Sequence, residues 1–158
     1  MSATTSSVIL GAGLMGRLLA NTLAQHGHQV QVHEAQGADG QGSAARVAAA
    51  MLAPLAESAI TEMPVVRMGH HGLTRWPQLI AALPEPVFFQ QNGTLVLWHR
   101  QDAAEAKRFE SLLVRTQQQC PELPSIQRLD VHALHRHEPG LEERFNQGLY
   151  LPGEGQLD

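Results

Sequence analysis

Three glycines and one acid near the start of the chain have types and spacings that point to a specific chemistry. Gly11, Gly13 and Gly16 form a Gly-x-Gly-x-x-Gly pattern, and Glu34 lies 18 residues after the last of them. Such glycines allow a tight turn, a close approach of the backbone to a pyrophosphate, and close packing of a helix on a sheet. The acid accepts hydrogen bonds from adenosine ribose hydroxyls and would repel the 2′-phosphate of NADP. The pattern predicts a dinucleotide site.

The stretches of sequence around these glycines follow the order strand, helix, strand. Residues 8–10 are a short apolar run typical of a buried parallel strand. A helix is predicted from Leu14 to about His26, where Gly27 ends it, and residues 30–34 are a second apolar run that ends in the acid. The N-terminus of that helix offers free N–H groups and a partial positive charge to phosphates. On its predicted buried face lie Met15, Leu18, Leu19, Thr22 and Leu23.

A second element follows the acid after a short glycine-rich loop. Ser43 is placed to cap the N-terminus of a short alanine-rich helix that stops before Pro54. Two interpretations stay open at this point. The helix could direct a second set of N–H groups at an anion while its small side chains let a flat ligand lie close. It could equally be an ordinary packing helix, which periodicity alone favours.

Length, charge and composition restrict the class of protein. The 158 residues suffice for one domain with a core or for parts of two, and the net charge of −4 provides no basic surface for nucleic acid or an anionic membrane. The single Cys120 excludes an internal disulfide and fits a reducing compartment. No apolar run approaches the roughly 20 residues of a membrane span, and residues 1–7 do not read as part of a signal peptide. We therefore expect a cytoplasmic location.

The middle of the chain predicts a helix followed by a hairpin. Pro64 suits the first turn of a helix that runs to about Leu83, in which Pro77 introduces a kink or a junction. Its predicted buried face comprises Leu73, Trp76, Ile80 and Leu83. Strand-like residues 87–91 and 94–98 flank Asn92-Gly93, which is a strong signal for a β-hairpin.

The last third of the chain adds one more helix and two strands. Asp102 with Glu105 resembles a capping box, and the helix that it opens is predicted to run to about Gln119. Phe109, Leu112, Leu113 and Thr116 form its inward face. Residues 125–129 and 148–151 are further strand candidates. Helices packed on one face of antiparallel strands give this part an α+β character.

Neither the histidines nor the cysteine forms a recognisable catalytic or metal site. His132, His135 and His137 lie close in sequence, as do His70-His71, but no cysteine or acid completes a known ligand pattern. Cys120 lies at a predicted helix end with no evident activating base. We expect solvated histidines, an unreactive thiol and no metal.

Several short segments of the sequence resemble those of a known family. Besides the glycine pattern, Glu34 and residues 43–52, they are residues 51–57, 91–95, 138–141 and 148–152. Together they resemble the D-amino-acid oxidase superfamily of FAD enzymes, and within it the glycine oxidases of bacterial thiamine biosynthesis. One departure is Ala50, where the family usually has glycine. The added methyl group would tighten the flavin-facing surface without abolishing binding.

The resemblance implies an α/β fold with two domains. Residues 1–83 would be the N-terminal part of an FAD/NAD(P)-binding Rossmann-like domain, incomplete in this chain. Residues 84–153 would begin an α+β antiparallel-sheet substrate domain, and residues 154–158 would start the return to the FAD-binding domain. The family's substrate-carboxylate arginine, active-site tyrosine and late glycine-rich stretch find no counterpart here. We therefore expect the chain to be the N-terminal part of a longer oxidase, inactive in isolation.

The resemblance also implies the cofactor and its contacts. FAD would bind through Gly11, Gly13, Leu14, Met15, Gly16, Glu34, Ala35, Ser43, Ala44, Ala45, Ala49, Ala50 and Met51. Of these, Met51 would also lie near the substrate, and no catalytic acid or base is required of this segment. The implied reaction oxidises glycine or a related small amine to the imine, and oxygen is reduced to hydrogen peroxide, in thiamine (thiazole) biosynthesis. The family tends to form homo-oligomers.

Three other functions stay open from the sequence. A D-amino-acid dehydrogenase of the same superfamily would pass electrons to a quinone instead of oxygen. The Gly-Ala-Gly-Leu-Met-Gly motif also resembles that of NAD-dependent 3-hydroxyacyl-CoA dehydrogenases. Residues 43–52 and the predicted hairpin disfavour this interpretation, because such enzymes continue with regular βα units. A non-catalytic, truncated dinucleotide-binding module is the third.

Overall fold

The computed structural model describes residues 5–158, without the side chains of residues 142 and 143, and the chain forms two compact units. The first unit, Met1–Ala50, contains β1 (Ser6–Leu10), α1 (Leu14–Gln25), β2 (Gln29–His33) and the short 3₁₀ helix η1 (Ala44–Val47). The second unit, Met51–Asp158, contains β3 (Met51–Leu52), η2 (Ala56–Ala59), α2 (Met63–Ala81), β4 (Phe89–Gln90), β5 (Thr94–Leu97), η3 (Arg100–Asp102), α3 (Ala103–Gln119), β6 (Gln127–Asp130), α4 (Val131–His137), η4 (Pro139–Arg144), β7 (Gln147–Leu151) and β8 (Gly155–Leu157).

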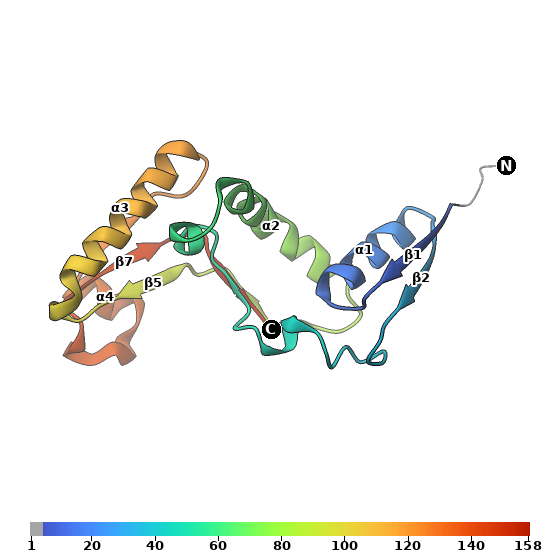
Figure 1. Cartoon of the computed structure of the whole chain (residues 1–158). Helices are drawn as coiled ribbons and strands as arrows, with labels where there is room; N and C mark the ends of the chain where they lie inside the picture. The colour runs from blue at the N-terminus through green and yellow to red at the C-terminus, as the bar shows by residue number, and fades with distance from the viewer. Residues whose placement is uncertain (1–4) are drawn as a thin grey trace. The chain divides into compact units, whose positions relative to one another are not determined.

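The first unit has the predicted strand–helix–strand order. Strands β1 and β2 pair in parallel, from Ser6 opposite Gln29 to Leu10 opposite His33, and α1 connects them and packs beside them (Figure 1). Gly27 follows the helix with a φ of 83°, a left-handed conformation that glycine adopts without steric strain. The prediction of a βαβ start is therefore confirmed, but the expectation that residues 8–10 form a buried strand is wrong, because only Ile9 is buried while Val8 and Leu10 are 61% and 83% exposed.

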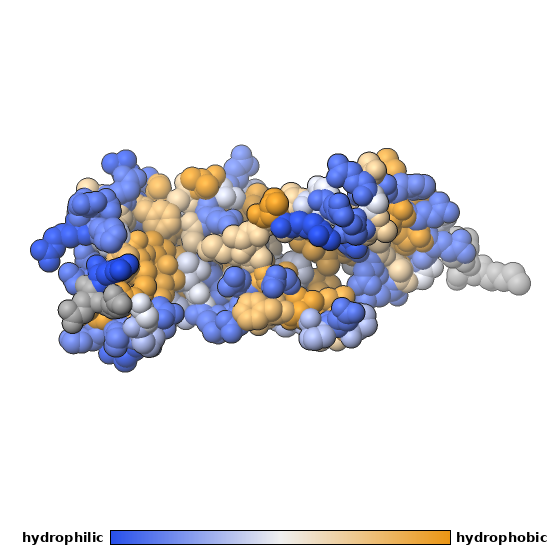
Figure 2. All heavy atoms as spheres, turned by 90° about the horizontal axis from the view of Figure 1, so that it is seen from below, coloured by the Kyte–Doolittle hydropathy of each residue, from blue (hydrophilic) through white to orange (hydrophobic). Residues whose placement is uncertain are grey.

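The predicted buried face of α1 is only partly correct. Leu18 and Leu23 are half-buried, but Met15 and Leu19 are 77% and 50% exposed, and Thr22 is exposed as well. The reason is that a sheet of two strands offers a narrow surface, which cannot cover the whole apolar face of the helix. Figure 2 shows hydrophobic residues, coloured orange, on the face of the chain that it presents.

The alanine-rich stretch after Ser43 is a short turn and not the helix that the sequence predicts. The Ser43 hydroxyl accepts a hydrogen bond from the Ala45 amide, so the predicted N-cap is present. Helical structure nevertheless ends at Val47, and Ala50 has a φ of 56°. A left-handed residue cannot continue a right-handed helix, and Met51–Leu52 then pairs with β8 as a strand.

The second unit contains two three-stranded antiparallel sheets. Their strand orders are β3-β8-β4 and β5-β7-β6. A core joins the second sheet to α2, α3 and the segment that follows β3, and it consists of Leu55, Val66, Leu113, Cys120, Leu123, Leu149 and Leu151. The antiparallel character expected of this part is confirmed, and β5, β7 and α3 are seen together in Figure 1.

The hairpin predicted at Asn92-Gly93 does not form. Strand β4 pairs with β8 and β5 pairs with β7, so the two flanking strands belong to different sheets. Gly93 is left-handed with a φ of 84°, and an added Cβ there would overlap the ring of Tyr150. The Tyr150 hydroxyl donates to the Asn92 carbonyl at 2.8 Å. Because β7 and β8 arrive from more than fifty residues along the chain, a local turn signal could not reveal this pairing.

The helices of the second unit largely follow the predictions. Helix α2 has Pro64 in its first turn and continues past Pro77, with Leu73 buried, whereas Leu83 is exposed beyond its end. The predicted inward face of α3 is confirmed by the buried or half-buried state of its four members. Asp102 precedes α3 but makes no side-chain capping bond, because the 3₁₀ turn η3 leads directly into the helix. The capping-box prediction is therefore wrong.

Candidate functional site

The β1–α1 turn shows why glycine is needed at two of the three motif positions. Gly11 has a φ of 99°, which only glycine adopts readily, and it donates a backbone hydrogen bond to the His33 carbonyl at 2.7 Å. An added Cβ at Gly16 would overlap the carbonyl oxygen of Gly11. Both glycines therefore maintain the close packing of helix and strand that the sequence predicts.

Gly13 has a different environment, which leaves room for a ligand. Its backbone is extended, with a φ of −67°, and an added Cβ would make only an ordinary contact with the Ser43 hydroxyl at 3.5 Å. The first intrahelical hydrogen bond is the one from the Arg17 amide to the Gly13 carbonyl. The amides of Leu14, Met15 and Gly16 are therefore free of intrahelical partners, as at any helix N-terminus. A phosphate could approach these donors unobstructed.

Glu34 lies at the end of β2 with its carboxylate beside the glycine turn. Its Oε2 accepts a hydrogen bond from the Ala12 amide at 2.6 Å, and its Oε1 accepts from the Gln36 amide at 3.2 Å. These backbone donors, the Ala12 amide above all, hold the pKa of the carboxyl below its usual value, so it is ionised at neutral pH. An ionised carboxylate has further acceptor capacity, which ribose hydroxyls can use.

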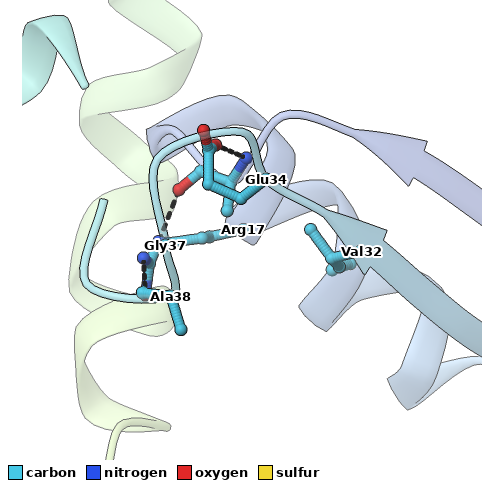
Figure 3. A pocket seen from close by; sticks show the side chains of 7 residues that line it. Arg17, Val32, Glu34, Gly37 and Ala38 are labelled. Carbon is cyan, nitrogen blue, oxygen red and sulfur yellow. Dashed lines mark hydrogen bonds between the residues drawn. The ribbon is translucent and has the colours of Figure 1, made fainter. Parts of the chain in front are cut away.

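A cavity of about 490 Å³ opens beside this carboxylate. It is lined by Ala12, Arg17, Ala20, Val32, Glu34, Gly37 and Ala38. Figure 3 shows Arg17 extending across it towards the loop after Glu34. The Arg17 Nε donates to the Ala12 carbonyl and its Nη2 donates to the Ala38 carbonyl, each at 2.6 Å. The guanidinium thus joins the glycine turn to that loop.

The structure gathers most of the sequence-predicted cofactor residues in the first unit. Gly11 to Gly16, with Leu14 and Met15, form the turn and the first turn of α1, while Glu34 and Ala35 follow β2. The Ser43 hydroxyl lies close to Gly13, and Ala44 and Ala45 continue from it as η1. Ala49 and Ala50 end the first unit, whereas Met51 belongs to β3 of the second.

Several residues that line the cavity were not among the predicted contacts. These are Ala12, Arg17, Ala20, Val32, Gly37 and Ala38. A signal for Arg17 existed in the sequence, because a cation directly after the third glycine must lie near the start of α1. Its two carbonyl partners, however, could be identified only from the folded loop.

Other reactive side chains do not form a second site. Cys120 is fully buried, and burial raises the pKa of its thiol, which makes it a poor nucleophile. His132 and His135 are exposed on α4, and His137 packs against the ring of Tyr150. Within residues 5–158 as described, no group of three or more ligating side chains is arranged to hold a metal ion. None of the described helices is both long and apolar enough to cross a bilayer.

Comparison with known proteins gives a family for nearly the whole chain. Residues 7–158 match the model of the DAO family, described as FAD dependent oxidoreductase. A comparison with curated proteins gave no match.

Solved structures agree with the chain in fold at low sequence identity. Iminodiacetate oxidase from Chelativorans sp. BNC1 matches with a TM-score of 0.76 and 24% identity, over 96% of this chain and 40% of that one. Glycine oxidase from Bacillus cereus ATCC 14579 matches with a TM-score of 0.74 and 21% identity, over 98% and 40%. Glycine oxidase from Geobacillus kaustophilus matches with a TM-score of 0.73 and 23% identity, over 98% and 41%. The chain thus spans about two fifths of the length of these structures.

Proposed function

The chain belongs to the DAO family of FAD-dependent oxidoreductases, and from this membership we propose that it supplies the FAD-binding start of an oxidase acting on a small amino acid or amine. Glycine is the substrate that we favour, and the products are its imine and hydrogen peroxide. The observation that carries the proposal is the placement of the Glu34 carboxylate. It is ionised, accessible and hydrogen-bonded to the Ala12 amide beside an open helix N-terminus.

The residues present fit FAD. The uncovered amides of Leu14 to Gly16 and the partial positive charge of the α1 N-terminus would bind the pyrophosphate. Glu34 would accept hydrogen bonds from the ribose hydroxyls. Ala20 and Val32 line the cavity beside Glu34, and they offer apolar surface to the adenosine end of the cofactor.

The remaining predicted contacts concern the flavin end. When bound, FAD supplies the acceptor for the hydride that leaves the substrate carbon and the route by which oxygen becomes hydrogen peroxide. Ala44 and Ala45 would donate backbone hydrogen bonds near the phosphates. The small side chains of Ala49 and Ala50 would allow close approach, and Met51 would face the flavin and the substrate. This segment would position the cofactor and the substrate and would exclude water. No catalytic acid or base is required of it.

The choice of substrate rests on the resemblance and on the kind of protein that shares the fold. Two of the similar solved structures are glycine oxidases, and a third is an iminodiacetate oxidase. These substrates are small and carry a carboxylate next to the amine. A role in thiamine (thiazole) biosynthesis, a homo-oligomeric state and a cytoplasmic location belong to the same proposal. Because the family depends on FAD, an NAD-dependent hydroxyacyl-CoA dehydrogenase is no longer a candidate.

The test uses the protein expressed from its whole reading frame. We expect a yellow protein with a flavin absorbance spectrum and release of hydrogen peroxide with glycine or sarcosine. Reduction of a quinone dye without oxygen consumption would instead identify a dehydrogenase. A colourless protein that takes up no flavin would overturn the proposal and leave a non-catalytic module.

A matched pair of variants tests the role of the carboxylate. Glu34→Gln removes the negative charge of the carboxylate that accepts hydrogen bonds from the Ala12 amide and the ribose, so FAD should bind about tenfold more weakly. Asp39→Asn removes the same charge five residues later, where no ribose contact is proposed, and should leave FAD affinity unchanged. Equal affinities in the two variants would remove Glu34 from the site.

A further inference from the structure

A second glutamate, in the other unit, is more deeply buried than any other charged side chain that the structure describes. Glu154 follows the turn after β7, next to Gly155 at the start of β8, and it is 2% exposed. Burying a carboxyl group without compensation is costly, so such a residue requires a structural or functional explanation. The proposed FAD contacts do not use it.

The carboxyl group of Glu154 is hydrogen-bonded to a segment nearly one hundred residues earlier in the chain. Its Oε1 accepts from the Leu55 amide and from the Ala56 amide, both at 2.8 Å. The Glu154 main-chain carbonyl accepts from the Gly93 amide at 2.9 Å. One residue thus joins the segment after β3 and the β4–β5 connection to β8.

The second carboxyl oxygen has no comparable role. Glu154 Oε2 is buried and has no hydrogen bond of acceptable geometry among the described residues. Loss of hydration raises the pKa of Glu154, and the negative charge of Glu57 adds to the rise. The Ala56 amide, the nearby Thr94 hydroxyl and the Leu55 amide oppose this rise. The hydrogen bonds from Leu55 and Ala56 therefore require an acceptor oxygen at Oε1. They do not require a negative charge on the carboxyl group.

The two amides lie just beyond the residue that is proposed to face the flavin. Strand β3 has only two residues, Met51 opposite Gln156 and Leu52 opposite Gly155. Two rungs of a ladder hold a strand weakly, and the bonds from Leu55 and Ala56 to Glu154 extend the attachment of this segment to β8. Met51 itself is 50% exposed, so its side chain is available to a ligand.

We propose that Glu154 is a positioning residue, which holds the Met51–Ala56 segment in place for the flavin by accepting hydrogen bonds from Leu55 and Ala56. It acts through Met51 and touches neither cofactor nor substrate. The inference rests on the proposed function, because it assumes that Met51 faces the flavin. What matters is the reach and acceptor capacity of Oε1, and not the charge of the side chain.

Three substitutions separate reach from charge. Glu154→Gln keeps an oxygen acceptor at the same reach and lacks the charge. Glu154→Asp keeps the charge but is one methylene shorter, so it cannot reach both amides. Glu154→Leu lacks both the acceptor and the charge. If the leucine variant does not fold, Glu154→Asp still tests the effect of a shorter reach. Glu57→Gln is the control, since it removes a nearby exposed charge without touching the two amides.

Two measurements on the FAD-loaded protein from the whole reading frame test the proposal. We expect amide hydrogen exchange at Leu55 and Ala56 to be about tenfold or more faster in Glu154→Asp and Glu154→Leu, and unchanged in Glu154→Gln and Glu57→Gln. FAD dissociation should accelerate, and the flavin absorbance maximum should shift, in the same two variants only.

The outcomes distinguish this inference from the proposed function. If the wild-type protein holds no FAD, the proposed function fails and this inference falls with it, whatever the exchange data show. If FAD is bound but the four variants have the same flavin spectrum and dissociation rate, Glu154 is not a positioning residue for the flavin. If Glu154→Asp resembles wild type and Glu154→Gln does not, charge and not reach is required, which also overturns the inference.

Discussion

Two carboxylates use the same kind of bond in opposite surroundings. Glu34 in the first unit accepts from backbone amides at an accessible site, and those amides lower its pKa. Glu154 in the second unit also accepts from backbone amides, but burial dominates and raises its pKa. The accessible group keeps its charge and has lone pairs available to a ligand. The buried group uses its acceptor oxygen for hydrogen bonds within the folded chain. The balance of hydration and hydrogen bonding therefore decides which of the two glutamates has an acceptor available to a cofactor.

The largest expected effect contrasts the stability of the two leucine variants. Glu154→Leu leaves the Leu55 and Ala56 amides buried without an acceptor, which should lower the free energy of unfolding by about 3 kcal/mol. Glu34→Leu removes the acceptor of the Ala12 amide, but Ala12 lines the open cavity, where water can replace the carboxylate, so its denaturation midpoint should fall by much less. Chemical denaturation of both variants measures the difference. Equal losses of stability would mean that the two carboxylates do not differ as described.

The next prediction applies the same contrast to two glycines of the first unit. In Gly16→Ala the new methyl group overlaps the Gly11 carbonyl, and because backbone cannot move aside, unfolding should become easier by about 2 kcal/mol. In Gly13→Ala the new methyl group finds an ordinary contact, so stability without FAD should change by less than about 0.5 kcal/mol. FAD should nevertheless bind about tenfold more weakly to Gly13→Ala, because the methyl group enters the ligand's path. Thermal melting and flavin titration test both halves, and a stable Gly16→Ala protein would contradict the first.

The pH dependence of stability should have opposite signs for the two acids. The ordinary pKa of both is 4.5. For Glu154 the folded chain binds more protons than the unfolded chain above that pH, so its contribution falls as pH rises towards the raised pKa. For Glu34 the unfolded chain binds more protons below that pH, so its contribution is lost as pH falls towards the lowered pKa.

Glutamine variants isolate each contribution. Denaturation midpoints measured from about pH 3.5 to 6.5 should decline less steeply with rising pH in Glu154→Gln than in the wild type. Glu34→Gln should instead weaken the loss of stability on the acid side. If both variants change the profile on the same side of pH 4.5, one of the two assigned pKa directions is wrong.

The smallest expected effect concerns the backbone at the end of the first unit. Ala50 has a φ of 56°, a conformation that costs an alanine about 1 kcal/mol and costs glycine little. Ala50→Gly relieves this strain but loses about 0.5–1 kcal/mol to the greater freedom of the unfolded chain, so the net change should be close to zero. Ala49→Gly has no such strain to relieve and should be destabilising. A substantial loss of stability in Ala50→Gly would argue against the left-handed conformation.

Much of the first unit could be predicted because its signals are local. The turn at Gly11, the helix from Leu14, its end at Gly27 and the return strand all depend on residues a few positions apart. The position of Glu34 follows from the length of that βαβ unit. The inward face of α1 was less predictable, since which apolar residues are covered depends on how wide the neighbouring sheet is.

The second unit shows where local signals fail. Asn92-Gly93 has the sequence of a hairpin turn, yet the strands on either side pair with β7 and β8. A helix predicted after Ser43 is replaced by one turn and a strand, because β8 is available to pair with Met51–Leu52. In both places, pairing with strands about fifty to one hundred residues away outweighs a local propensity of about 1 kcal/mol.

The sequence by itself determined the βαβ start, the type of ligand and the acid that would accept from it, since glycine conformation, helix length and strand order are encoded in consecutive residues. Only the tertiary structure decided that Arg17 bridges two loops, that Met51 starts a strand in the second unit, and that Glu154 is buried against Leu55 and Ala56. The reason is that hydration and hydrogen-bond partners belong to the folded environment. The same type of side chain is therefore proposed as a cofactor ligand at Glu34 and as a positioning group at Glu154.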